Sequence, residues 1–119
     1  MIFPIKPISQ KRLGQILKGR NTAKYRDWRT AVLCRDQYKC QYPNCRNVDK
    51  LEIHHIKTFA KNSHIRTATF NGITLCASCH DKIQGREGAY EMTFFNIVKA
   101  NTRDQKARDA AAKENKDNS

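Results

Sequence analysis

Residues 71–80 read NGITLCASCH and, together with CQYPNC at residues 40–45, they decide the fold of this chain. Each stretch contains a pair of cysteines, with four residues between them in the first and two in the second. Both separations fall within the ligand spacing of structural zinc sites. A tight loop with a Pro-Asn turn and a helix start can place four thiolates tetrahedrally, which leaves no open position for substrate. We therefore predict a structural zinc ion with four ligands, Cys40, Cys45, Cys76 and Cys79.

The number and setting of the cysteines favour metal binding over disulfides. The chain has five cysteines, and its first twelve residues, MIFPIKPISQKR, contain neither the apolar core nor the cleavage site of a signal peptide. No stretch is long and apolar enough for a transmembrane helix. A cytoplasmic protein, whose thiols stay reduced, fits these observations. The fifth cysteine, Cys34, falls within a predicted helix and is interpreted as a small buried apolar residue.

The charge of the chain indicates a polyanionic partner. Lysine and arginine number 23 and aspartate and glutamate 11, which gives a net charge of +12 over 119 residues. Each phosphate that a cation neutralises releases counterions, so this excess favours nucleic acid. The alternatives are a solubilising surface or a membrane surface. A membrane surface requires a basic helix with a strong apolar face, and none stands out, so we expect no membrane partner.

Residues 1–22 are predicted to form a mobile basic arm. They carry five cations and no acid, and prolines and glycines weaken any helix there. The one-sided charge favours contacts with phosphate, with Lys11 and Arg12 as candidates. The alternative is a poorly ordered terminus without a role.

The rest of the chain is predicted to form a small α+β domain over residues 23–98 and a polar, partly helical tail over residues 99–119. Apolar residues at helical spacing predict a helix over residues 23–37, with a core-facing stripe of Tyr25, Trp28, Val32 and Leu33. The further predicted elements are strands at residues 51–56 and 72–75, helices at 78–84 and 90–98, and an irregular or partly helical connection at 57–71. A core this small is expected to need a metal as a supplement.

Three histidines and an asparagine are framed by the cysteine pairs. His54 and His55 end the first predicted strand, His80 directly follows the last zinc cysteine, and Asn71 lies between them. With these residues, the segments WRTAVLCRDQYKCQYPNC, LEIHHIK and FNGITLCASCH resemble the HNH endonuclease family, also called ββα-metal nucleases. The resemblance implies a hairpin followed by a helix, a treble-clef-like zinc-stapled core and flanking helices.

The resemblance also implies roles for the framed residues. His55 is expected to be the general base, Asn71 to orient the loop that carries it, and His54 and His80 to bind a catalytic divalent cation. Many family members have Asp in place of His54. Because two imidazoles are a softer ligand set than Mg²⁺ prefers, we expect Mn²⁺, Co²⁺ or Ni²⁺ to support activity at least as well as Mg²⁺.

Elementary geometry bears on these roles. An imidazole with a pKa near ~6.5 is largely neutral at pH 7 to 8 and can accept a proton from water. Consecutive helical residues point in different directions, so Cys79 can face the zinc while His80 faces the hairpin. Strand alternation would put His54 and His55 on opposite faces, and we therefore predict a bulge or break near His54.

Other residues near the motif have two interpretations each. Glu52 is either a hydrogen-bond partner of a metal-binding histidine or a solvated strand residue. Lys57 and Arg86 are candidate phosphate contacts, and a plain surface position is the alternative for Arg86. His64 has no place in the motif and is interpreted as a loop or surface residue.

The resulting hypothesis is a metal-dependent endonuclease that hydrolyses DNA phosphodiester bonds, one strand per event. The alternatives are a zinc-stapled DNA-binding module without catalysis, which leaves the histidines and Asn71 unexplained, and a structural accessory of a larger complex, which explains least of the charge. Small stand-alone proteins similar to this one are often encoded by phages or mobile elements. That similarity implies a phage-infected or bacterial cytoplasm and a packaging protein such as terminase as a partner.

Overall fold

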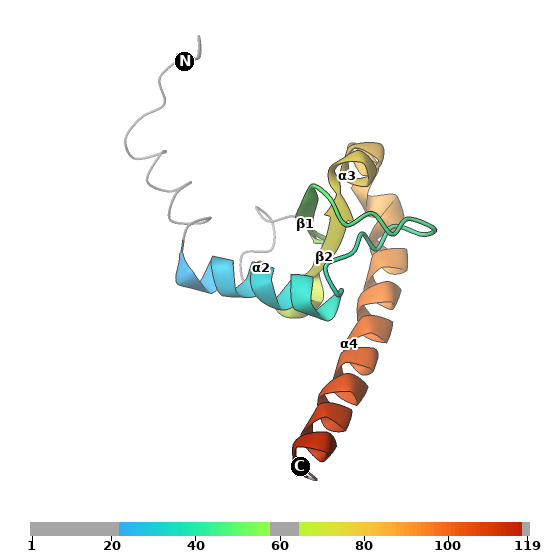
Figure 1. The fold of residues 1–119 in the computed structure, drawn as a ribbon. Coiled ribbons are helices and arrows are strands. Elements are labelled where there is room, and N and C mark those ends of the chain that lie inside the picture. Colours follow the sequence, from blue (N-terminus) through green and yellow to red (C-terminus); the bar gives the residue numbers. More distant parts are fainter. Residues whose placement is uncertain (1–21, 58–64, 118–119) are drawn as a thin grey trace.

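The computed structural model describes residues 22–57 and 65–117 (Figure 1). In chain order the elements are α2 (Ala23–Arg35), β1 (Leu51–His55), the 3-10 helix η1 (Thr69–Asn71), β2 (Gly72–Cys76), α3 (Ala77–Ile83) and α4 (Glu87–Asp117). Two antiparallel strands followed directly by a helix give the predicted small α+β fold. Residues 1–21 of the predicted basic arm and His64 lie outside the described residues.

The hairpin is the centre of the fold. β1 and β2 pair in continuous register from Leu51↔Cys76 to His55↔Gly72. All five residues of β2 are buried, whereas β1 has both buried and exposed positions. The main core forms where β2 meets α3 and α4, from Ile73, Leu75, Ile83, Phe94 and Val98 among others.

Helix α2 packs on the hairpin through Trp28 and Val32. Its first turn is capped by Thr22, whose Oγ1 accepts the backbone N–H of Tyr25 at 3.1 Å. Trp28 and Val32 are buried one turn apart, and a Cβ built on Gly72 would lie 2.7 Å from an atom of each. Only a glycine allows this approach. The predicted stripe is thus buried at these two positions and half-buried at the other two, Tyr25 and Leu33.

The end of α2 differs from the prediction because two charged residues turn inward there. The helix ends at Arg35, and both Arg35 and Asp36 are buried. They form a bidentate ion pair, with Nε to Oδ1 at 2.8 Å and Nη2 to Oδ2 at 2.9 Å. The guanidinium also donates to the carbonyls of Thr69 (2.7 Å) and Gly72 (2.6 Å). This pair fastens α2 to the turn that leads into β2.

Cys34 is exposed, so its interpretation as a buried apolar residue is wrong. The inward face of α2 is occupied by Trp28, Val32 and Arg35, which follow helical spacing. Cys34 falls outside that face, and its Sγ lies 3.7 Å from the hydroxyl of Tyr38.

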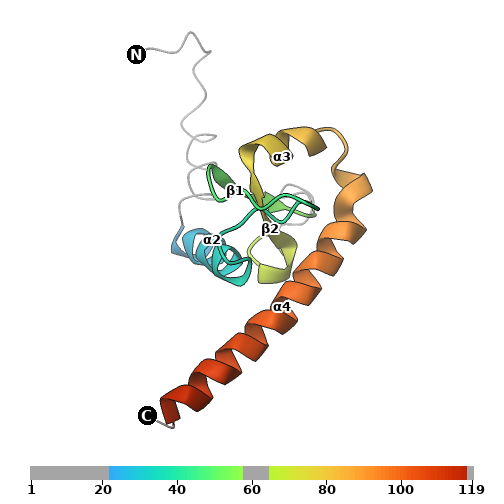
Figure 2. The same cartoon turned by 45° about the vertical axis from the view of Figure 1, so that its right-hand side comes forward.

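Helix α4 is longer than the predicted 90–98 helix. It runs without interruption for 31 residues, so the predicted boundary between domain and tail falls inside a helix. Asn101 and Arg108, from the predicted tail, bond to the end of α2: Asn101 Nδ2 to Asp36 Oδ1 at 2.9 Å and Arg108 Nη2 to the Arg35 carbonyl at 3.4 Å. Beyond this contact the helix extends away from the other elements (Figures 1 and 2). Among the described residues, no helix is both long and apolar enough to cross a membrane.

Candidate active site and metal centre

The four predicted zinc ligands converge. The Sγ atoms of Cys40, Cys45, Cys76 and Cys79 all lie within 4.8 Å of one another, and those of Cys45 and Cys76 are 4.0 Å apart. A tetrahedral site with Zn–S bonds of 2.3 Å needs thiolates about 3.8 Å apart, so the spacing suits a metal such as zinc. Three of the four cysteines are buried and Cys45 is half-buried. The predicted convergence of the two pairs is confirmed.

Local sequence explains how the first pair is held. The Cys45 N–H donates to the Tyr42 carbonyl at 2.9 Å, and Asn44 has a φ of 67°. Pro followed by a residue with positive φ is the pattern of a type II turn. The Gln41 N–H donates to the Thr74 carbonyl at 2.9 Å, which attaches this loop to β2, where the second pair begins.

The thiols differ in how readily they ionise. The backbone N–H of Cys79 lowers the pKa of Cys76 to about 6, because it stabilises the thiolate. Burial raises the pKa of Cys40 and of Cys79. A metal ion must therefore displace protons from at least two of its ligands, which makes its binding depend on pH.

A second cluster of imidazoles lies between β1 and α3. The rings of His54 and His80 are 5.3 Å apart, and Phe94 of α4 lies 5.7 Å from His54. His54 is 7 % exposed, and its Nε2 has no hydrogen-bond partner among the described residues. Burial lowers the pKa of His54 to about 4, so the ring is neutral at pH 7. A buried, neutral and unpartnered nitrogen beside a second imidazole suits a metal ligand.

His80 is oriented by a carboxylate. Its Nδ1 lies 3.2 Å from Oε2 of Glu52. Glu52 and His54 are two residues apart on β1 and therefore share a face of the strand. A carboxylate on one ring nitrogen fixes the tautomer and directs the other nitrogen toward a metal. This contact matches the first of the two interpretations of Glu52, that of a hydrogen-bond partner of a histidine.

His55 is held on the other side of β1. Its ring stacks on Trp28 of α2, with centroids 4.4 Å apart and an interplanar angle of 19°, and its Nε2 lies 3.1 Å from the Arg66 carbonyl oxygen. The ladder pairs every residue from Leu51 to His55, so the predicted bulge near His54 is wrong. Gly72, opposite His55 in this ladder, leaves room for Trp28.

Asn71 fixes the chain directly after His55. It is fully buried; its Oδ1 accepts the Lys57 N–H at 2.8 Å and its Nδ2 donates to the Lys57 carbonyl at 3.3 Å. The Ile56 N–H donates to the Asn71 carbonyl at 2.9 Å. The side chain and backbone of one residue thus hold the segment that leaves β1.

The segment that carries these residues matches a known family model. Residues 39–86 match the model of the HNH endonucleases. Over these residues the chain is similar to the HNH endonuclease family. The match includes both cysteine pairs and the framed residues His54, His55, Asn71 and His80. This similarity indicates nuclease activity in general. Comparisons with curated proteins and with solved structures found no match.

The structure describes two of the four predicted phosphate contacts. Lys57 forms an ion pair with Glu91 of α4, with Nζ and Oε1 2.5 Å apart. Arg86 is exposed between α3 and α4. Lys11 and Arg12 lie outside the described residues.

Two residues beside the histidines have roles that the sequence pattern did not predict. Trp28 was interpreted only as core, but its ring supports His55, and its Nε1 donates to the Ala68 carbonyl at 2.8 Å. Gly72 was interpreted only as the start of a strand. The Asn-Gly pair at residues 71 and 72 and the lone tryptophan were the available signals.

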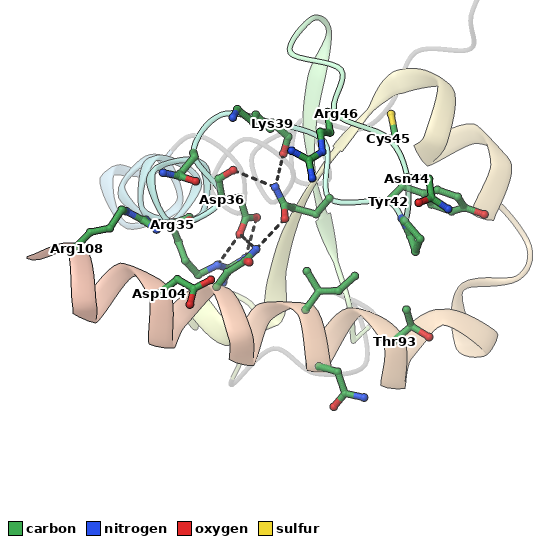
Figure 3. Close-up of a pocket in the computed structure, with 16 residues that line it drawn as sticks. Arg35, Asp36, Lys39, Tyr42, Asn44, Cys45, Arg46, Thr93, Asp104 and Arg108 are labelled. Carbon is green, nitrogen blue, oxygen red and sulfur yellow. Dashed lines mark hydrogen bonds and ion pairs between the residues drawn. The ribbon is translucent and has the colours of Figure 1, made fainter.

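Beside the HNH motif, a pocket of about 630 Å³ lies between the 39–46 loop and α4 (Figure 3). The Arg35–Asp36 pair lines it, with Asn101 bonded to both Asp36 and Gln41 at 2.9 Å. The lining also includes Lys39 and Arg46 on the loop and Asp104 and Arg108 on α4 (Figure 3). The pocket therefore carries charges of both signs, and its inner wall is formed by side chains that hydrogen-bond to one another.

Proposed function

We propose that this chain is a metal-dependent DNA endonuclease that hydrolyses one phosphodiester bond per event, with its four cysteines on a structural zinc ion. The observation that carries the proposal is the buried, unpartnered Nε2 of His54 beside His80 within an HNH domain. A structural histidine buried to this extent would be expected to have a hydrogen-bond partner. A ligand to a divalent cation needs that nitrogen unprotonated and unpaired.

The residues present fit a divalent cation. His54 and His80 would hold it through their Nε2 atoms, with Glu52 keeping His80 in the required tautomer. A bound cation supplies Lewis-acid stabilisation of a phosphate oxygen and of the leaving 3′-oxygen. Because both protein ligands are imidazoles, we expect Mn²⁺, Co²⁺ or Ni²⁺ to serve at least as well as Mg²⁺.

His55 is suited to act as the general base. The Arg66 carbonyl can only accept a hydrogen bond, so the contact at 3.1 Å places the proton of a neutral ring on Nε2. Nδ1 then carries the lone pair that takes a proton from water. The resulting hydroxide oxygen bonds to phosphorus as the bond to the 3′-oxygen breaks, which leaves a 5′-phosphate and a 3′-hydroxyl.

The orientation of the two histidines supports a position for the phosphate at the end of β1. Regular pairing turns His54 toward His80 and His55 toward Trp28, so the two rings leave β1 on opposite faces. The scissile phosphate therefore crosses the end of β1, with the base on one side and the cation ligands on the other. Asn71 and the Trp28 ring keep His55 in position for this attack.

A plasmid-nicking assay with Mn²⁺ tests the proposal. Wild type is expected to convert supercoiled plasmid to open circles, and His55→Ala to do so about 10²–10⁴-fold more slowly, the usual contribution of a general base. DNA binding by the variant, followed by fluorescence anisotropy, should be unchanged within about twofold. If wild type binds DNA but cuts it with none of Mn²⁺, Co²⁺, Ni²⁺ and Mg²⁺, the result would instead support a non-catalytic binding module.

A further inference from the structure

A second hollow, of about 400 Å³, lies between η1 and the middle of α4. We call it the Phe70 groove; its lining includes two phenylalanines, Phe70 and Phe95, and three cations, Lys99, Arg103 and Lys106. No acidic residue lines it. The groove is separate from the pocket in Figure 3, since the two have no lining residue in common.

The three cations form one face of α4. They follow one another at spacings of four and three residues, which places them on the same side of a helix. Among the side chains that the structure describes, none of the three has an ion-pair partner, whereas Lys57 nearby is neutralised by Glu91. The groove therefore carries an uncompensated charge of +3, which suits the phosphates of a nucleic-acid strand.

The aromatic residues add a face on which a planar group can stack. Phe70 is 51 % exposed, and its ring centroid lies 6.5 Å from that of Phe95. The η1 backbone that carries Phe70 is fixed on both sides of it, by Arg35 at the Thr69 carbonyl and by Asn71. An exposed ring on a fixed backbone loses little conformational entropy when it binds.

We propose that the Phe70 groove binds an unpaired strand of the DNA substrate, with a base on Phe70 and the backbone phosphates on the three cations. Single-stranded nucleic acid is bound by this combination of aromatic faces and a basic groove. A duplex keeps its base faces stacked inside and would leave Phe70 unused. The inference rests on the proposed function, because it names the form of DNA on which that nuclease acts.

The position of the groove connects it to the cleavage site. Phe70 directly precedes Asn71, which holds the chain after His55. An unpaired strand in the groove would therefore lie beside the scissile phosphate. The preferred substrate is then DNA with a junction between single and double strands, such as a fork or a flap, rather than continuous duplex.

The test compares binding of three fluorescent DNA probes of equal length: a duplex, a single strand and a fork. All proteins carry His55→Ala so that cutting during the measurement is negligible, and anisotropy gives the affinities. Phe70→Leu should weaken binding to the single strand and fork about 5–100-fold, the usual effect of losing one stacked base, and to the duplex less than twofold. Tyr38→Leu is the matched control, because Tyr38 is 50 % exposed and lies outside the groove; it should change neither.

A second variant tests the charges. The triple variant K99A/R103A/K106A should reduce the salt dependence of single-strand binding by about 2 in log–log slope, since each phosphate contact contributes about 0.7. The variant K24A/R29A/K39A removes three exposed cations elsewhere and should have a smaller effect. Three results would each overturn the inference. The two triple variants could lose single-strand affinity equally, or Phe70→Leu and Tyr38→Leu could do so. The third result is that the variants lose binding to anionic phospholipid vesicles rather than to DNA.

The two proposals fail separately. If wild type does not nick plasmid but the binding differences between variants are observed, the nuclease proposal is refuted and the groove remains a strand-binding site. Normal nicking, with duplex preferred over fork and no effect of Phe70→Leu, would refute the groove alone.

Discussion

At the scale of single residues, Gly72 decides how closely α2 approaches the hairpin. It pairs with His55 and leaves the space in which Trp28 stacks on that imidazole. The absence of a side chain at one position thus orients the general base that we propose. A glycine identified only as a strand residue gives no sign of this role, because the constraint comes from a helix that is distant in sequence.

We predict that Gly72→Ala destabilises the protein by about 1–3 kcal/mol, the usual result of overpacking. The new Cβ would lie 2.7 Å from atoms of Trp28 and Val32, so α2 must shift. Urea denaturation measures the stability, and nicking should slow because the support of His55 moves. Gly88→Ala is the control: its Cβ would meet nothing within 4 Å, and inside α4 alanine should be neutral or stabilising. Equal stability of the two variants would contradict this account.

At the scale of elements, the buried pair of Arg35 and Asp36 joins α2, the turn before β2 and α4. Asp36 accepts hydrogen bonds from the Thr74 N–H and from Asn101, each at 2.9 Å, in addition to its ion pair. Removing one partner of such a pair leaves the other charge buried and uncompensated. The relative positions of α2, the turn before β2 and α4 therefore depend on one carboxylate.

Asp36→Ala is predicted to lower the free energy of unfolding by about 3–5 kcal/mol, since the Arg35 guanidinium would stay buried without its partner. Thermal or urea denaturation measures the change. Asp104→Ala removes an exposed carboxylate from the rim of the same pocket and should change stability by less than about 0.5 kcal/mol. Similar losses in both variants would show that the pair does not hold the elements together.

The elements themselves were predictable to different degrees. Cysteine spacing and the short apolar runs predicted the hairpin, the following helix and the metal cluster, because these depend on local pattern. The inward turn of Arg35 and Asp36 could not be read from the sequence, since it needs partners at Thr69, Gly72 and Asn101. The length of α4 was also missed, because its second half is polar and lacks the apolar stripe that marks a packed helix.

At the scale of the whole molecule, the four-cysteine cluster connects the 39–46 loop to β2 and α3. Three of its members belong to the cluster of buried core residues, and the fourth packs against it. A domain of this size has a modest core, so a metal ion bound by this cluster would contribute its binding free energy to folding.

We predict one tightly bound zinc ion per chain and loss of cooperative unfolding when it is removed. Cys45→Ser should lose the ion and the fold together, as measured by zinc content and by circular dichroism during thermal denaturation. Cys34→Ser provides the control, because Cys34 is exposed and does not belong to the cluster. Retained cooperative unfolding after complete removal of the metal would contradict a structural role.

The whole molecule also brings the proposed base and cation ligands to one strand end, and this is the central claim. The dependence of nicking rate on Mn²⁺ concentration tests it most directly, in wild type and in His80→Ala. We expect the wild-type rate to saturate, and the variant to need at least about tenfold more Mn²⁺, because it retains one of the two imidazole ligands. Saturation at the same Mn²⁺ concentration in both proteins would contradict the claim.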